Sequence, residues 1–175
     1  MKPGRALTTT TVLLMALAGC ASSPAQRDFP SLSGRTERPM PIREGVIQTA
    51  LSLLGAPYRF GGKTPAGFDC TGFIGYVYRN SADIVLPRDS HRLVRMGKAV
   101  SPTDLLPADL VYFRIENQKP LHMGIYLGDG KFIHAPSTGG KVNIQGMSQD
   151  YWKSRYLGAR RIVSAVSNRF LNRSV

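Results

Sequence analysis

The chain has 175 residues, of which 42% are hydrophobic and 19% charged, and its formal net charge at pH 7 is +12. This length allows one domain with a full hydrophobic core plus some appendage, and the ordinary apolar content excludes a disordered protein. So basic a chain suggests an acidic partner, although a generally solvated basic surface explains the charge about as well.

The first 20 residues have the pattern of an export signal. Lys2 and Arg5 form a positive start, and residues 6–17 are an uncharged apolar stretch too short to span a bilayer. The stretch closes with Leu17-Ala18-Gly19-Cys20, which resembles the bacterial lipoprotein signal. That resemblance implies cleavage after residue 19 and attachment of lipid to Cys20. An ordinary signal peptide or a membrane anchor is the alternative.

The residue after this cysteine bears on the destination of the protein. Ala21 stands where an Asp usually marks retention at the inner membrane, so the resemblance implies an outer-membrane anchor with the protein facing the periplasm. Loss of Lys2 and Arg5 would lower the formal charge from +12 to +10. Export argues against nucleic acid as the acidic partner, so cell-wall carboxylates or lipid head groups fit better.

A tether is predicted to separate the lipid from the folded domain. Prolines and serines are scattered through residues 20–41 without hydrophobic periodicity, which is typical of a flexible segment with an r.m.s. span of about 25 Å. The domain is predicted over residues 42–165, followed by a C-terminal tail at residues 166–175.

The domain is expected to open with a helix. Val46, Ile47, Ala50, Leu51 and Leu54 recur at helical spacing, and Gly55 follows them as a C-cap residue would. A loop rich in aromatic residues and glycine, PYRFGG at residues 57–62, then leads toward Cys70.

A second helix is predicted to start at Cys70, with Asp69 as its N-cap. Phe73, Ile74 and Val77 fall on the same face as the thiol. The positive end of the helix dipole is expected to lower the pKa of this thiol from about 8.5 toward roughly 3.5–7.5, which would prepare a nucleophile. A structural cysteine that packs like a small hydrophobe is the alternative.

The number of cysteines favours a nucleophilic role for Cys70 over a structural one. The chain has two cysteines, and Cys20 is committed to lipid if the export signal is correctly identified. Cys70 would then be a lone thiol in a compartment where thiols tend to be oxidised, and such a thiol is a liability unless it is buried or used.

Shorter elements are expected after this helix. The patterns predict short helices over residues 87–96 and 148–155, and strands over residues 110–113, 121–127, 131–135, 141–144 and 157–163. Helices come first and a mostly antiparallel sheet follows, so the predicted fold class is α+β.

Two of the three histidines lie on one predicted hairpin, around Gly128-Asp129-Gly130. If the loop has three residues with Gly130 in the left-handed position, His134 lies one diagonal step of about 7–8 Å from His122 on the same face. The opposite face then carries a consistent apolar set, namely Leu121, Met123, Ile125, Leu127 and Ile133. A two-residue loop would place the histidines on opposite faces, but the clean partition of apolar residues favours the first register.

A lone thiol and two histidines on one face suggest nucleophilic catalysis. Cys70 would attack a carbonyl as the thiolate, His122 would act as base and then acid, and His134 would orient His122. Two alternatives are Zn²⁺ bound by these three residues with water as the fourth ligand, and histidines that merely line a solvent-facing strand. The spacing lacks that of ordinary zinc motifs, and His91, among polar residues, is given no role.

Four segments follow one another in a characteristic order, namely PYRFGG at residues 57–62, FDCTGF at 68–73, HMGIYLG at 122–128 and FIHAP at 132–136. They resemble the NlpC-type cell-wall peptidases, a papain-like family of cysteine peptidases often found as bacterial lipoproteins, and the resemblance covers roughly residues 42–163. It implies a papain-like α+β fold, with the nucleophile at the start of a helix packed on a mostly antiparallel sheet. Thr71 stands where many members have serine, a conservative departure.

The resemblance also implies roles for individual residues. Cys70, His122 and His134 would form the triad, and the Tyr58 hydroxyl would lie near the oxyanion position, opposite the backbone N–H of Cys70. Asp69 would meet an amino group of the substrate in addition to capping the helix. Residues 88–90 and 136–140 would edge the cleft.

Together with the export signal, the resemblance implies an outer-membrane lipoprotein that hydrolyses amide bonds in peptidoglycan stem peptides, through an acyl-enzyme and without a cofactor. A monomer is expected, although the sequence carries no signal for the oligomeric state. The bond is γ-D-glutamyl–diaminopimelate within a stem or D-alanyl–diaminopimelate in a cross-link, and cleft shape decides between them. Two other functions compete: a non-catalytic wall-binding lipoprotein on a degenerate fold, and an acyltransferase on the same fold. The intact set of Cys70, His122, His134 and Tyr58 argues against the first.

Overall fold

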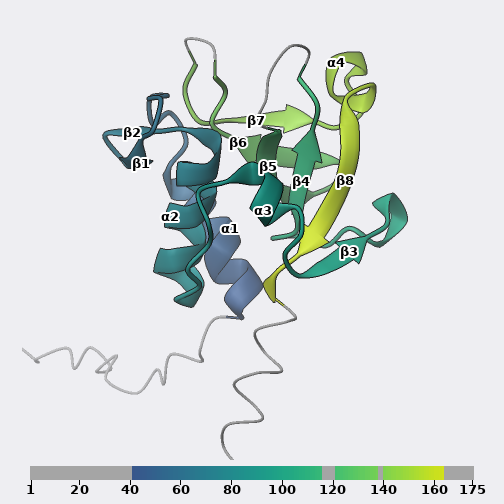
Figure 1. Ribbon diagram of the computed structural model, residues 1–175, viewed down its shortest axis with the longest axis horizontal. Helices are drawn as coiled ribbons and strands as arrows, with labels where there is room; N and C mark the ends of the chain where they lie inside the picture. The colour runs from purple at the N-terminus through teal and green to yellow at the C-terminus, as the bar shows by residue number, and fades with distance from the viewer. Residues whose placement is uncertain (1–40, 116–120, 138–139, 164–175) are drawn as a thin grey trace, which may run out of the picture. The chain divides into compact units, whose positions relative to one another are not determined.

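The computed structural model describes residues 41–115, 121–137 and 140–163 (Figure 1). The predicted signal segment, Cys20, the tether up to residue 40 and the tail at residues 166–175 lie outside the described residues. The helices are α1 (Ile42–Ser52), α2 (Cys70–Ala82), α3 (Ser90–Leu93), the 3₁₀ helix η1 (Pro102–Asp104) and α4 (Asp150–Lys153). None of these helices is long and apolar enough to cross a membrane.

Six strands form one antiparallel sheet in the order β3-β8-β4-β5-β6-β7, and a separate two-stranded hairpin joins β1 to β2. The strands are β1 (Lys63–Thr64), β2 (Gly67–Phe68), β3 (Lys98–Val100), β4 (Leu110–Phe113), β5 (His122–Gly128), β6 (Lys131–His134), β7 (Asn143–Gly146) and β8 (Tyr156–Arg161). Figure 1 shows α1 and α2 side by side against this sheet. The predicted α+β fold is confirmed.

Both long helices begin where the sequence predicts. The Asp69 side chain accepts a hydrogen bond from the Gly72 N–H at 2.7 Å, which caps α2. Helix α1 ends at Ser52, shortly before Gly55 turns the chain with φ +81°. Val46 and Ala50 of α1 are buried, whereas Leu51 is exposed, so its apolar face is narrower than the spacing suggested.

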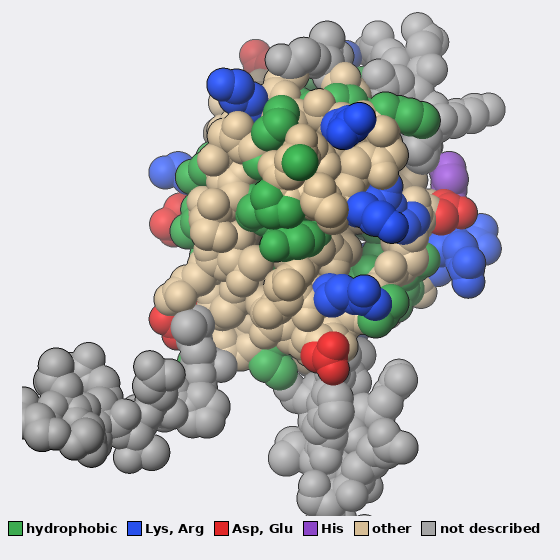
Figure 2. All heavy atoms as spheres, turned by 90° about the vertical axis from the view of Figure 1, so that its left-hand side faces the viewer, with side chains coloured by type: hydrophobic (Ala, Val, Ile, Leu, Met, Phe, Trp, Pro, Cys, Tyr) green, Lys and Arg blue, Asp and Glu red, His purple; other side chains and the backbone are tan. Residues whose placement is uncertain are grey.

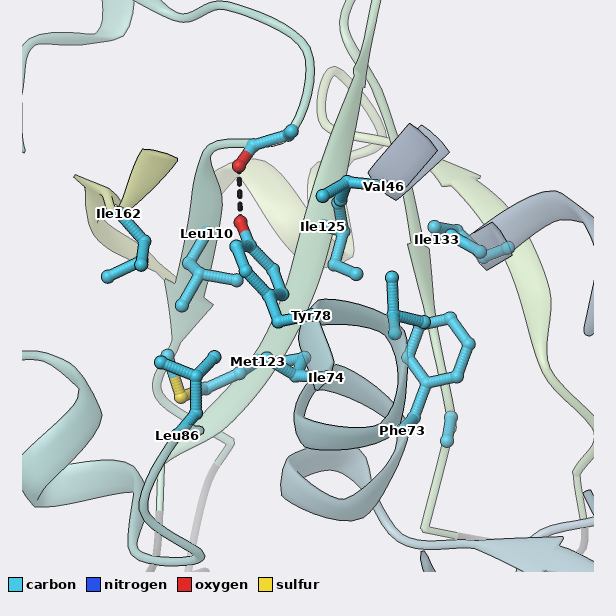
Figure 3. Close-up of a cluster of buried hydrophobic side chains, with 14 of the residues drawn as sticks. Val46, Phe73, Ile74, Tyr78, Leu86, Leu110, Met123, Ile125, Ile133 and Ile162 are labelled. Atoms are coloured by element: carbon cyan, nitrogen blue, oxygen red, sulfur yellow. Dashed lines mark hydrogen bonds between the residues drawn. The ribbon is translucent and has the colours of Figure 1, made fainter. Parts of the chain in front are cut away.

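Alternate residues of the sheet enter two apolar clusters. One cluster joins strand residues to α1 and α2 (Figure 3), and includes Val46, Phe73, Ile74, Tyr78, Leu110, Met123, Ile125 and Ile133. The second cluster consists of Val111, Phe113, Phe132, Trp152 and Ala159. Because adjacent residues such as Leu110 and Val111 enter different clusters, the two clusters lie on opposite faces of the sheet. Helix α4 contributes Trp152 to the face that α1 and α2 leave open.

The histidine hairpin has the predicted strand register but a different turn. Ile125 pairs with Ile133, as predicted, and Met123, Ile125 and Ile133 all enter the core. The loop itself has two residues, Asp129 and Gly130, which both take positive φ (50° and 67°), while Gly128 pairs with Lys131. A register shift between Tyr126 and Gly128 absorbs one residue of β5. This bulge keeps both histidines on one face despite the short loop.

Buried polar groups fasten the turn before β4 to the rest of the domain. The fully buried Asp109 accepts hydrogen bonds from Nε and Nη2 of Arg161 at 2.9 and 2.8 Å, and from the Leu106 N–H at 2.9 Å. The buried Tyr78 hydroxyl donates to the carbonyl of Ala108 (Figure 3), and burial raises the pKa of Tyr78. These bonds tie the turn to β8 and α2.

Candidate active site

Cys70 is the first residue of α2, and its free, half-buried thiol lies against strand β5. The backbone N–H groups of Thr71, Met123 and Cys70 all lower the pKa of the thiol through hydrogen bonds. Met123 directly follows His122, so this contact brings the start of α2 to the strand that carries the predicted base.

Two stronger influences raise the pKa of Cys70 above its usual value. Burial penalises the thiolate most, and the neighbouring Asp69 carboxylate adds repulsion between like charges. The expected lowering of this pKa by the helix dipole is therefore wrong for the free protein. The same carboxylate that caps the helix opposes the effect of the helix N-terminus on the thiol.

His122 and His134 are hydrogen-bonded to each other. Nε2 of His122 lies 2.7 Å from Nδ1 of His134, and the two rings are nearly perpendicular, with an interplanar angle of 88°. The side chains come from adjacent strands β5 and β6, so the structure brings together the two histidines that the hairpin register placed on one face. The other ring nitrogen of His122, Nδ1, takes no part in this hydrogen bond.

Burial keeps both imidazoles neutral near pH 7. His122 is 6% exposed and His134 is 1% exposed. Burial lowers the pKa of His122 to about 4. Burial, and then the proximity of His122, lower the pKa of His134 to about 3, against a hydrogen bond with Asn143 that raises it. The alternative in which these histidines line a solvent-facing strand does not fit such burial.

Two residues at this pair were not found from the sequence. Trp152, the single tryptophan of the chain, stacks on His122 with ring centroids 5.7 Å apart and meets His134 edge-on at 5.0 Å. Asn143 contacts the far nitrogen of His134, with Oδ1 at 3.2 Å from Nε2. Asn143 pairs directly with His134 in the β6–β7 register, so a correct placement of β7 would have revealed it.

Tyr58 is electrostatically coupled to the thiol, and its place near the oxyanion stays a prediction. The pKa of its phenol is raised first by burial and then by the charges of Cys70 and Asp69. Its backbone N–H donates to the carbonyl of Gly140 at 2.9 Å.

The loop that carries Tyr58 packs closely on the start of α2. The Gly62 carbonyl accepts hydrogen bonds from the Asp69 N–H at 3.1 Å and from Nη1 of Arg88 at 3.2 Å. A Cβ atom at Gly72 would come within 1.9 Å of that carbonyl oxygen, so only glycine permits this approach. The close packing positions the loop, and with it Tyr58, relative to Cys70.

Asp69 already has several partners. Besides capping α2, its Oδ1 accepts from the Thr71 hydroxyl at 3.0 Å, and its Oδ2 forms an ion pair with Nη2 of Arg88 at 2.6 Å. Arg88 thus holds one carboxylate oxygen of the residue predicted to meet a substrate amino group. That substrate contact stays a prediction, whereas the capping role of Asp69 is confirmed.

A pocket of about 200 Å³ adjoins the histidine pair. It is lined by Ile115, His122, His134, Pro136, Ser137, Tyr151 and Trp152. Pro136 and Ser137 belong to the segment expected to edge the cleft. Across the described ranges, no three His, Cys, Asp or Glu side chains are grouped so that they could hold a metal ion. The facing nitrogens of His122 and His134 are directed to each other rather than to a shared third position.

Comparisons with known proteins identify relatives of this chain. Over 123 residues the chain is 39% identical to the murein DD-endopeptidase MepH of Escherichia coli K12, covering 68% of this chain and 45% of that one. It is 44% identical over 118 residues to the gamma-DL-glutamyl hydrolase of Bacillus subtilis 168, covering 66% of this chain and 28% of that one. The chain thus spans less than half of the length of these two relatives.

A solved structure and a family pattern give the same result. An NlpC/P60 family protein from Bacillus cereus superposes with a TM-score of 0.64 at 36% identity, over 69% of this chain and 40% of that one. The pattern of the NlpC/P60 family matches residues 55–161, which is more than half of the chain and contains the thiol, both histidines and Tyr58. The resemblance seen in the sequence motifs is confirmed, and the chain belongs to the NlpC/P60 family.

Proposed function

We propose that the protein is a cell-wall endopeptidase that hydrolyses amide bonds in the peptide part of peptidoglycan, with Cys70 as nucleophile. The observation that carries the proposal is the position of the Cys70 thiol, at the start of α2 and against the strand that bears the hydrogen-bonded His122–His134 pair. The names of the relatives support the substrate class, since one is a murein DD-endopeptidase and the other a glutamyl hydrolase.

In the proposed reaction, Nδ1 of His122 takes the thiol proton as the Cys70 sulfur attacks the amide carbonyl. The new C–S bond leaves an oxyanion, for which the backbone N–H of Cys70 and the Tyr58 hydroxyl are the proposed donors. His122 then protonates the leaving amine as the C–N bond breaks, and water hydrolyses the thioester with His122 again as base. His134 holds the ring of His122, and Trp152 covers the pair.

The pKa shifts of Cys70 and His122 indicate when the thiol proton is transferred. Burial and Asp69 disfavour the thiolate, and burial disfavours the imidazolium. The resting pair is therefore a thiol beside a neutral imidazole. In this proposal proton transfer accompanies the attack on substrate, instead of preceding it as a preformed ion pair.

The bond that is cut follows from one digestion. Purified peptidoglycan is incubated with the protein, and the released fragments are analysed by mass spectrometry. Cleavage at γ-D-glutamyl–diaminopimelate shortens stems, whereas cleavage at D-alanyl–diaminopimelate converts cross-linked dimers to monomers. Cys70→Ser is the matched control and should lose nearly all activity while folding normally. Unchanged peptidoglycan with the wild type, or full activity of Cys70→Ser, would contradict the proposal, and inhibition by a chelator would favour the zinc alternative.

A further inference from the structure

We propose that Asn143 is a positioning residue that fixes which nitrogens of the His122–His134 pair carry protons, so that the ring nitrogen of His122 available to Cys70 is a bare acceptor. The inference rests on the proposed function of the site, because it concerns how His122 serves as base. Asn143 touches neither the thiol nor the substrate carbonyl in this scheme and acts through His134.

The orientation of the Asn143 amide follows from its neighbours. Its Nδ2 lies 2.9 Å from the carbonyl oxygen of Lys141, and a carbonyl can only accept, so the atom that faces it is the NH₂ group. The amide oxygen, Oδ1, is then the atom directed at Nε2 of His134 at 3.2 Å. Nε2 of Gln145 donates to the same oxygen at 3.0 Å and helps to hold it there.

The proton positions follow in sequence along the three side chains. Because Oδ1 of Asn143 can only accept, Nε2 of His134 must carry a hydrogen. His134 is buried and neutral, so its Nδ1 is bare and accepts the 2.7 Å hydrogen bond from Nε2–H of His122. His122 is also neutral, and its second nitrogen, Nδ1, is therefore bare. A bare Nδ1 is what a base for the Cys70 thiol requires.

The opposite arrangement shows what Asn143 prevents. If His134 carried its proton on Nδ1, it would donate to Nε2 of His122, and the proton of His122 would move to Nδ1. That nitrogen could then accept nothing from the thiol. The hydrogen bond between the two rings fits both tautomer arrangements equally well. Which of the two arrangements forms therefore depends on the group at the far nitrogen of His134. In the described part of the chain that group is Asn143.

Substitution at Asn143 separates this role from a structural one. Asn143→Leu keeps a similar volume without an acceptor, whereas Asn143→Asp keeps an acceptor at the same place. We expect Asn143→Leu to lower kcat about tenfold or more with KM little changed, since a wrong tautomer removes the base without removing substrate contacts. Asn143→Asp should restore most of kcat. Asn80→Leu, at an exposed asparagine of α2, is the matched control and should behave as wild type.

A second measurement needs no substrate and therefore does not depend on the proposed function. With only three histidines in the chain, ¹⁵N NMR of the imidazoles distinguishes protonation at Nε2 from protonation at Nδ1 at each ring, with the exposed His91 as internal reference. We expect both His122 and His134 to carry the proton on Nε2 in wild type and Asn143→Asp, and a mixture of tautomers in Asn143→Leu. If Asn143→Leu does not fold, Asn143→Ala carries the same expectation.

Different results would overturn the role of Asn143 and the proposed function. Unchanged tautomers in a folded Asn143→Leu or Asn143→Ala variant, or a kcat equal to that of the wild type, would overturn the inference. Failure of the wild type to cut peptidoglycan would reject the proposed function, while the tautomers would still report on Asn143.

Discussion

At the scale of single residues, the Cys70 thiol has competing neighbours. The start of α2 supplies backbone N–H groups that favour a thiolate, but burial and the adjacent Asp69 carboxylate outweigh them. Although Asp69 is ion-paired with Arg88 at 2.6 Å, its charge still raises the pKa of the thiol. Asp69 therefore supports the geometry of the site while making the thiol harder to ionise.

We expect alkylation of Cys70 by iodoacetamide to be slow at pH 7 and to rise with a midpoint above about 8.5, the usual pKa of a cysteine. The direction follows because a raised pKa leaves less thiolate at any given pH. The measurement is the alkylation rate against pH, followed by mass spectrometry at Cys70. Rapid alkylation at pH 6 would show instead a preformed thiolate–imidazolium pair with His122.

At the scale of elements, periodicity predicted elements whose apolar side chains enter the core. Helix α2 and the body of the β5–β6 hairpin follow from it, because a slip of one residue would have turned Met123, Ile125 and Ile133 out of the core. The turn was predicted wrongly, although Asp129-Gly130 is a typical pair for a two-residue turn with both φ positive. The β-bulge between Tyr126 and Gly128 offsets the shorter turn and keeps both histidines on one face. Its position was not predicted from the hydrophobic pattern.

Short elements escaped prediction for a physical reason. Strands β1 and β2 have two residues each, too few to show a period, and β7 begins two residues later than expected. That shift hid the pairing of Asn143 with His134. The thiol, the histidines and Tyr58 could be found from motifs, and Asn143 from a correct strand register, whereas Trp152 is recognisable only once α4 is packed against the sheet.

The buried histidine pair of this hairpin should make the fold sensitive to acid. In the unfolded chain a histidine has a pKa near 6.5, but in the folded chain those of His122 and His134 are about 4 and about 3. Between these values the unfolded state binds more protons, so stability is fully present above pH 6.5 and is lost as the pH falls. From pH 7 to pH 5 each histidine removes about 2 kcal/mol, and the Tm should fall by about 10 °C.

Calorimetry at pH 7, 6 and 5 measures this slope. The double variant His122→Gln, His134→Gln should flatten it, whereas His91→Gln, at an exposed position, should leave it unchanged. A Tm that stays constant over this range in the wild type would show that the two imidazoles titrate normally.

The ion pair of the β4 turn should contribute strongly to folding. Asp109→Ala leaves Arg161 without its carboxylate and removes the acceptor of the Leu106 N–H, so we expect a loss of about 3–5 kcal/mol in the free energy of unfolding. Urea denaturation measures it, and Asp150→Ala, at an exposed carboxylate, is the control with a loss below about 1 kcal/mol. Equal losses in the two variants would mean that the buried ion pair of Asp109 stabilises the fold no more than an exposed carboxylate does.

At the scale of the whole molecule, the chain is strongly basic, with a formal net charge of +12. On the face shown in Figure 2, basic side chains lie among apolar ones, and the acidic side chains in view lie toward its rim. If the proposed substrate is correct, attraction of this charge to cell-wall carboxylates would raise the local concentration of the protein without fixing its orientation. Salt should weaken this attraction, because the Debye length is only about 8 Å at physiological ionic strength.

The proposed lipid anchor would hold this basic protein at one membrane. The apolar stretch that ends in Leu17-Ala18-Gly19-Cys20 motivates the expectation that Cys20 is lipidated and holds the mature protein at the outer membrane. We expect the wild type in the outer-membrane fraction with labelled palmitate incorporated, and Cys20→Ser without label and absent from that fraction. The isolated Cys20→Ser protein should digest peptidoglycan within about twofold of the wild-type rate, because Cys70, His122 and His134 all lie in the domain beyond the predicted tether. Unchanged membrane retention of Cys20→Ser, together with no lipid on the wild type, would replace the lipid anchor with a membrane-inserted N-terminus.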